Sequence, residues 1–180
     1  KSISVLGTNG KQSTINAIFS ILKKTNFKCN VYTSPHIQKI NERFVFENKE
    51  LRDDELASLF EEVEKINNNQ SITFFEILTA CYFYKAAQYP ENINLIEAGL
   101  FHRFDATNIL NNNLASVITP ISKDHLDWLP KDQQTIKKIV FEKTSSLLNS
   151  NIVISKQNSE NTTKYIKETY DSLQRNLEKK

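Results

Sequence analysis

The sequence predicts an α/β fold in which helices flank a mostly parallel sheet. Short apolar runs alternate with segments of helical periodicity along the 180 residues, and this alternation is typical of strands joined by crossover helices. The glycines support the same prediction. There are only three of them, against about 7% of residues in an average protein. Gly7, Gly10 and Gly99 all lie where a predicted strand gives way to a loop.

Five short apolar runs predict the strands of the sheet. In chain order they cover residues 3–6, 28–32, 93–97, 115–119 and 151–154. A polar loop over 33–43 follows the second run. Beyond that loop, Phe44 and Phe46 alternate with polar residues, which indicates a small hairpin or an extended arm.

Helical spacing of apolar residues predicts the helices that separate most of these strands. In chain order they cover residues 15–22, 56–66, 74–87, 136–147 and 166–177. Asp53 and Asp54 suit the start of the second helix, because acidic side chains are favoured at a helix N-terminus. The third helix is apolar nearly all round, which predicts that it is buried.

The loops that follow the parallel strands should share one edge of the sheet. Gly7, Thr33, Ala98 and Pro120 each begin the segment after a predicted strand. Ligands of parallel α/β sheets bind just outside the carboxyl ends of the strands. We therefore expect these four loops to converge and to form the functional site.

Composition is that of an ordinary globular protein of one domain, with 39% apolar and 24% charged residues. The net charge of +2 gives no electrostatic case for nucleic acid or an anionic membrane as the main partner. No apolar stretch approaches the ~20 residues of a membrane span.

Cys29 and Cys81 lack metal-ligand spacing, so we expect a reduced, cytoplasmic protein. No signal peptide is visible, and the absence of Met leads us to expect that residue 1 lies within or at the edge of a longer protein.

Residues 7–13 form a candidate phosphate-binding loop, Gly7-Thr-Asn-Gly-Lys-Gln-Ser13, between a strand and a helix. Glycines let backbone amides close around phosphate oxygens, and the helix N-terminus adds a favourable field. Lys11 would neutralise the outer phosphates. The spacing is not the usual G-x-x-x-x-G-K-[ST] pattern, because position 5 is Val. A glycine-rich turn with a surface lysine is the alternative, and the loop alone does not decide between them.

Glu97 and His125 follow strands at the same predicted edge. A carboxylate at position 97 could hold Mg²⁺ directly or through water, and the alternative is a solvated strand terminus. His125, preceded by Asp124, could be a metal ligand or a general base. The alternative for it is a loop histidine with a backbone partner. Chemistry alone gives no role to His36 or His102.

Lys143 falls at helical spacing with Ile136, Val140 and Leu147, so we expect it to point toward the core. Burial disfavours the charged ammonium. A neutral amine can act as a base, as a nucleophile, or as an acceptor of CO₂ that forms a carbamate. The alternative is a lysine whose stem packs while its amine reaches solvent.

Several motifs occur in a fixed order along the chain. They are Gly7-Thr-Asn-Gly-Lys-Gln-Ser-Thr14, Tyr32-Thr-Ser-Pro-His36, Asn41-Glu-Arg43, Thr73-Phe-Phe-Glu76, Glu97-Ala-Gly-Leu100, Arg103-Phe-Asp-Ala-Thr-Asn108, Asp124-His125 and Glu142-Lys143. The first resembles the phosphate loop of the Mur ligase superfamily. The set as a whole, from residue 3 to about 154, resembles the folylpolyglutamate synthase and dihydrofolate synthase family within it.

The resemblance implies a P-loop NTPase-like fold, that of the Mur ligase central domain, and an ATP-dependent carboxylate–amine ligase. Such an enzyme adds L-glutamate to dihydropteroate or to a (poly)glutamylated folate through an acyl phosphate. Residues 1–180 would then be one incomplete ATP-binding domain, without the family's N-terminal segment and C-terminal glutamate-binding domain. A monomer with only small-molecule partners is expected.

The resemblance also implies roles for individual residues. The ATP-binding residues would be Gly7, Thr8, Asn9, Gly10, Lys11, Ser13 and Thr14. Two Mg²⁺ ions would be held by Ser34, Glu97, His125 and a carbamylated Lys143. The catalytic residues would be Lys11, His125 and Lys143. Contacts with the pterin and its neighbours would come from Thr73, Phe74, Arg103, Asp105 and Ala106.

The chain departs from the family pattern at several positions. Gln12 and the pair Phe101-His102 stand where the family usually has glycines, and the bulky pair is expected to narrow or reshape the folate side of the cleft.

Two other functions stay open. A Mur ligase of peptidoglycan precursors shares the loop and the metal scheme, although residues 33–36 and 105–108 argue against it. A nucleotide-binding module that has lost catalysis is the other.

Overall fold

The computed structural model describes residues 1–110, 112–147 and 150–177. Within these ranges seven strands form one sheet, in the order β4-β3-β2-β5-β1-β6-β7. The strands are β1 (Ser2–Leu6), β2 (Cys29–Tyr32), β3 (Phe44–Phe46), β4 (Lys49–Glu50), β5 (Ile93–Glu97), β6 (Ala115–Ile118) and β7 (Asn151–Ile154). Five of them pair in parallel, and β3 and β4 add an antiparallel hairpin at one edge. The predicted α/β fold is confirmed.

Helices cover the sheet as the periodicity predicts. They are α1 (Lys11–Lys24), α2 (Asp53–Asn67), α3 (Phe74–Ala86), α4 (Ile136–Thr144) and α5 (Glu160–Leu177). The helix over 74–87 is only partly buried, contrary to the prediction, because Phe74 at its start is 62% and Tyr84 39% exposed. Among the described helices, none is long and apolar enough to cross a membrane.

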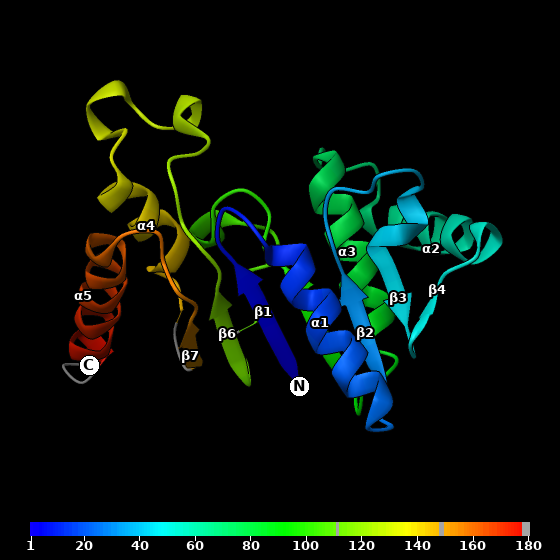
Figure 1. Cartoon of the computed structure of the whole chain (residues 1–180). Helices are drawn as coiled ribbons and strands as arrows, with labels where there is room; N and C mark the ends of the chain where they lie inside the picture. Colours follow the sequence, from blue (N-terminus) through cyan, green and yellow to red (C-terminus); the bar gives the residue numbers. More distant parts are fainter. Residues whose placement is uncertain (111, 148–149, 178–180) are drawn as a thin grey trace.

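The two faces of the sheet are set by the alternation of side chains along each strand. Val5, Val31 and Leu95 pack with Ile15 of α1 on one face. Their neighbours Tyr32 and Ile96 belong to a second cluster, which includes residues of α2 and α3. Leu6 and Ile118 belong to a third, which includes residues of α4 and α5. Figure 1 shows α1 in front of the strands; in this view α3 lies to its right and α4 to its left.

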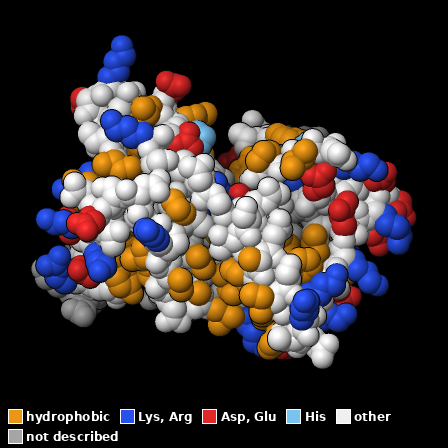
Figure 2. All heavy atoms as spheres, in the orientation of Figure 1, with side chains coloured by type: hydrophobic (Ala, Val, Ile, Leu, Met, Phe, Trp, Pro, Cys, Tyr) orange, Lys and Arg blue, Asp and Glu red, His pale blue; other side chains and the backbone are white. Residues whose placement is uncertain are grey.

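Strand register brings the loops after β1, β2, β5 and β6 into one row. Leu6 lies opposite Ile118, Val5 opposite Glu97, and Tyr32 opposite Ile96. The chain therefore leaves these strands side by side at their carboxyl ends, the upper edge in Figure 1. The expected convergence is confirmed. In Figure 2 the surface is hollowed at this edge, between two raised parts of the molecule.

Candidate nucleotide and metal site

The phosphate loop turns sharply at its two glycines. Gly7 has φ +142° and Gly10 has φ +80°, a region that side chains disfavour. A Cβ on Gly7 would lie 2.8 Å from the carbonyl oxygen of Thr119 and closer still to its hydroxyl. A Cβ on Gly10 would meet no atom within 4 Å. Gly7 is thus required by packing against the loop after β6, whereas Gly10 faces open space.

The backbone amides of the loop form two groups: those of Thr8 and Asn9, which are bound to the protein, and those at the start of α1, which are not capped. Those of Thr8 and Asn9 donate to the carbonyl of Pro120, at 3.0 and 3.3 Å. The start of α1, after Gly10, has no side-chain cap. An anion at that position would receive hydrogen bonds from the free amides of the first helical turn, and the helix dipole would favour it. The sequence did not indicate that the Pro120 carbonyl accepts these hydrogen bonds, because every residue has a backbone carbonyl and no side-chain pattern distinguishes this one.

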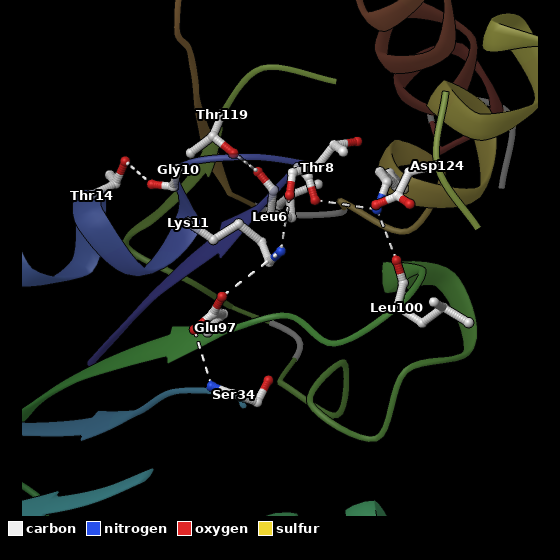
Figure 3. A network of polar contacts seen from close by, with 12 residues as sticks. Leu6, Thr8, Gly10, Lys11, Thr14, Ser34, Glu97, Leu100, Thr119 and Asp124 are labelled. Carbon is white, nitrogen blue, oxygen red and sulfur yellow. Dashed lines mark hydrogen bonds and ion pairs between the residues drawn. The ribbon is translucent and has the colours of Figure 1, made fainter. Parts of the chain in front are cut away.

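Lys11 and Ser34 approach the carboxylate of Glu97 from opposite sides (Figure 3). The Lys11 amine lies 3.8 Å from Glu97 Oε1, and the Ser34 amide donates to Oε2 at 3.0 Å. Burial raises the pKa of Glu97, while the Ser34 amide and the charge of Lys11 act in the opposite direction. Glu97 is 3% exposed, so the solvated strand end considered above is wrong.

Lys143 points inward, as its helical spacing predicts, and is 3% exposed. Its amine donates to the carbonyl of Leu100 at 2.8 Å and to that of Gly7 at 3.2 Å. The ring of Phe101 lies over it, 5.3 Å away. Burial, and then the nearby charge of Lys11, lower the pKa of Lys143 to about 8. An amine that reaches solvent is therefore excluded.

His125 lies in the loop after β6, directly before the short 3₁₀ turn Leu126–Trp128, and has a left-handed backbone with φ +53°. Its Nε2 lies 3.1 Å from a carboxylate oxygen of Asp124, and both side chains are 40% exposed. Its ring is nearly perpendicular to that of Phe101, with centroids 6.3 Å apart, and Phe101 also lies beside the Lys143 amine. Among the described residues, no three or more His, Cys, Asp or Glu side chains are grouped as a metal site. A metal site here would therefore need Ser34 or Lys143 as well.

The residues expected to contact substrate lie in two places. Thr73 caps α3, and its hydroxyl accepts from the Glu76 amide. Asp105 lies close to Gly99 and accepts from the Thr107 amide at 3.0 Å, in the turn that also contains Ala106. Arg103 turns toward α4 instead. It is paired with Glu142 at 3.2 Å and lies over the ring of Phe141.

His102 is buried rather than placed in the cleft. It is 3% exposed, and its Nδ1 lies 2.9 Å from the hydroxyl of Ser146. Burial lowers the pKa of His102 to about 4. Of the two bulky residues after Leu100, therefore, only Phe101 lies among the candidate site residues. Gln12 is half-buried in the first turn of α1.

Gln157 is a supporting residue that the sequence did not indicate. Its side chain accepts from the Ile121 amide at 2.9 Å and donates to the Ser155 carbonyl at 3.0 Å. It thereby ties the chain after β7 to the loop whose Pro120 carbonyl holds the phosphate loop. A single glutamine outside any motif gives no sequence signal of this kind.

Sequence comparison finds relatives named dihydrofolate synthase/folylpolyglutamate synthase. The chain is 38% identical to the dihydrofolate synthase/folylpolyglutamate synthase of Escherichia coli (strain K12) over 135 residues, which cover 74% of this chain and 31% of the relative. It is 35% identical to the Bacillus subtilis protein of the same name over 150 residues, or 79% and 34%. The chain spans about a third of the length of these relatives. No family model matches it.

Solved structures agree with the sequence comparison. The ligand-free bifunctional folylpolyglutamate synthase/dihydrofolate synthase of Yersinia pestis superposes with a TM-score of 0.83 at 30% identity, covering 96% of this chain and 42% of that one. An E. coli homologue in complex with ADP, without folate substrate, gives 0.79 at 31%, covering 95% and 40%. The chain is therefore a relative of the dihydrofolate synthase/folylpolyglutamate synthase family, corresponds to part of those proteins, and has their fold.

Proposed function

We propose that this chain is the ATP-binding part of a ligase that joins L-glutamate to dihydropteroate or to a folate. The observation that carries the proposal is the position of Lys11 and Ser34 on either side of Glu97, beside the uncapped start of α1. Relatives named for this reaction support it, as do structural neighbours solved with ADP or AMPPCP.

The proposed reaction has two steps. The γ-phosphoryl group of ATP passes to the substrate carboxylate, which gives an acyl phosphate and ADP. The amino group of L-glutamate then attacks the acyl carbon, an amide bond forms, and phosphate leaves. Phosphoryl transfer depends on positioning and charge neutralisation more than on covalent help from the protein. Residues 7–14 would hold the phosphates, and Lys11 would neutralise charge on the transferred group.

Three of the four groups proposed at this edge would offer Mg²⁺ the oxygen ligands that it prefers, beside bound phosphates; His125 would offer a ring nitrogen instead. The Ser34 hydroxyl and the Glu97 carboxylate would hold one ion. His125 and a carbamate on Lys143 would hold or orient the second. Bound Mg²⁺ would neutralise charge that develops on the phosphates.

The carbamate fits the surroundings of Lys143. Its lowered pKa increases the neutral fraction of the amine, which is the form that attacks CO₂. When the Lys143 nitrogen forms a bond to the carbon of CO₂, the nitrogen loses a proton and the product is a carbamate anion. Three charged groups, Lys11, Asp124 and Asp105, act on the amine. The anionic carbamate would be attracted to Lys11 and repelled by the two carboxylates, and a bound Mg²⁺ would offset that repulsion.

The reaction is tested with the complete protein that contains this chain. ADP release should require both L-glutamate and either dihydropteroate or a folate, and Lys11→Met should abolish it while Lys24→Met, at the far end of α1, should not. Release that depends on a UDP-muramyl acceptor would identify a peptidoglycan ligase instead. Tight MgATP binding without turnover of any folate would identify a module that has lost catalysis.

We also propose that residues 1–180 form one incomplete ATP-binding domain. The ground for this is the chain's coverage of about a third of its relatives. By themselves, residues 1–180 should bind ATP weakly at best and ligate nothing. Sustained glutamate addition by this part alone would contradict the proposal.

A further inference from the structure

The motif Asn41-Glu42-Arg43 forms a short 3₁₀ turn (Ile40–Arg43) next to the loop over residues 33–39. The carboxylate of Glu42 accepts hydrogen bonds from three consecutive amides of that loop. These are the amides of Ile37, Gln38 and Lys39, at 2.8, 2.9 and 2.9 Å. Hydrogen bonds to a charged acceptor are about twice as strong as neutral ones. One side chain thus fixes the C-terminal half of the loop.

The same turn also holds the N-terminal half of the loop. Arg43 donates through Nε to the Nδ1 atom of His36 at 3.0 Å. The Arg43 carbonyl accepts from the Thr33 amide, and the Glu42 carbonyl accepts from the Thr33 hydroxyl, each at 3.4 Å. The loop is therefore tied at both ends and near its middle.

Asn41 fastens the turn to the rest of the protein. Its side-chain amide donates to the Leu51 carbonyl at 3.0 Å and to the Asp53 carboxylate, at the start of α2, at 2.9 Å. Asn41 and Arg43 are both buried, and the next residue, Phe44, is fully buried in the core. The three residues thus connect a packed scaffold to the loop that contains Ser34.

We propose that Asn41, Glu42 and Arg43 are positioning residues that keep Ser34 beside Glu97. In this role they set the affinity of the site for Mg²⁺ without contacting the nucleotide or the ion themselves. The effect on Mg²⁺ rests on the proposed function, whereas the restraint on the loop does not. A loop released from Glu42 would have to be ordered again each time the ion binds, and the ordering would weaken binding.

The test compares Glu42→Gln with Glu50→Gln, which removes an exposed carboxylate in β4. Amide hydrogen exchange of residues 37–39 should become about tenfold faster in Glu42→Gln, and the Mg²⁺ concentration that half-saturates binding of a non-hydrolysable ATP analogue should rise at least about threefold. Nucleotide binding in EDTA should not change. Glu50→Gln should match the wild-type protein in all three measurements. Glu42→Asp, which keeps the charge on a shorter side chain, should fall between them.

Two results would overturn the inference. Unchanged exchange at residues 37–39 in both Glu42 variants would show that the carboxylate does not restrain the loop. Faster exchange with an unchanged Mg²⁺ requirement would show that the restraint does not position Ser34. If the wild-type protein bound no nucleotide at all, the proposed function would fail, and the exchange rates would still decide whether Glu42 holds the loop.

Discussion

The amine of Lys143 donates a hydrogen bond to the carbonyl of Gly7 at 3.2 Å, across 136 positions of sequence. A buried helix lysine thus contacts the first residue of the phosphate loop. Because the same amine also donates to the Leu100 carbonyl at 2.8 Å, it connects the loops after two neighbouring strands.

Lys143→Ala should lower the turnover of the complete protein by about 10- to 100-fold, because it removes a proposed metal ligand. A short carboxylic acid added to the assay should restore part of the activity by replacing the carbamate. Steady-state ADP release measures both effects. Lys137→Ala, an exposed position on the same helix, serves as the control, and unchanged activity in Lys143→Ala would contradict the carbamate.

His102→Asn should make the protein less sensitive to acid. The pKa of His102 is about 4 in the folded chain and 6.5 as the ordinary value, so between these values the unfolded state binds the extra proton. Folding stability therefore falls as the pH drops through this window. The wild-type protein should lose about 2 kcal/mol more than the variant between pH 6.5 and 4.5.

Urea unfolding at pH 6.5, 5.5 and 4.5 measures that difference. Asn keeps an acceptor for the Ser146 hydroxyl, and the packing lost with the imidazole ring is the same at each pH, so it cancels from the difference between pH values. His125→Asn, at an exposed position whose left-handed backbone Asn tolerates, should leave the pH dependence as in the wild type. Equal acid sensitivity in all three proteins would refute the buried, neutral state of His102.

Gly7→Ala and Gly10→Ala should differ in cost although both glycines have positive φ. Gly7→Ala forces a Cβ against Thr119, and we expect a loss of about 3 kcal/mol or more from strain and overpacking together. Gly10→Ala meets open space and should cost only about 1–2 kcal/mol, from its backbone conformation. Thermal or urea unfolding distinguishes the two, and equal losses would speak against the contact with Thr119.

Gln157→Leu should weaken nucleotide binding without touching the nucleotide. The change leaves the buried Ile121 amide without its acceptor, at a cost of about 1–3 kcal/mol. The loop around Pro120 would then hold the Thr8 and Asn9 amides less firmly. Calorimetric titration with an ATP analogue measures the effect, with Gln133→Leu at an exposed position as the control. Unchanged affinity would show that this loop does not support the phosphate loop.

Local patterns predicted most of the fold. The apolar runs at 93–97 and 151–154 became strands with those same bounds, and the helices at 53–67 and 136–144 begin at or near their predicted signals. These features depend on neighbours within a few positions, so a single sequence contains them. The inward direction of Lys143 followed from the same helical periodicity.

The convergence of Gly7, Thr33, Ala98 and Pro120 on one edge was also determined by the sequence, because parallel strands end on the same side of a sheet. Tertiary structure alone decided what each side chain meets there. It buried His102 against Ser146, turned Arg103 toward Glu142, and joined Pro120 to the phosphate loop. Such contacts depend on which polar groups remain unpaired after the chain has packed, and several of the acceptors are backbone carbonyls, which every residue has and no sequence pattern distinguishes.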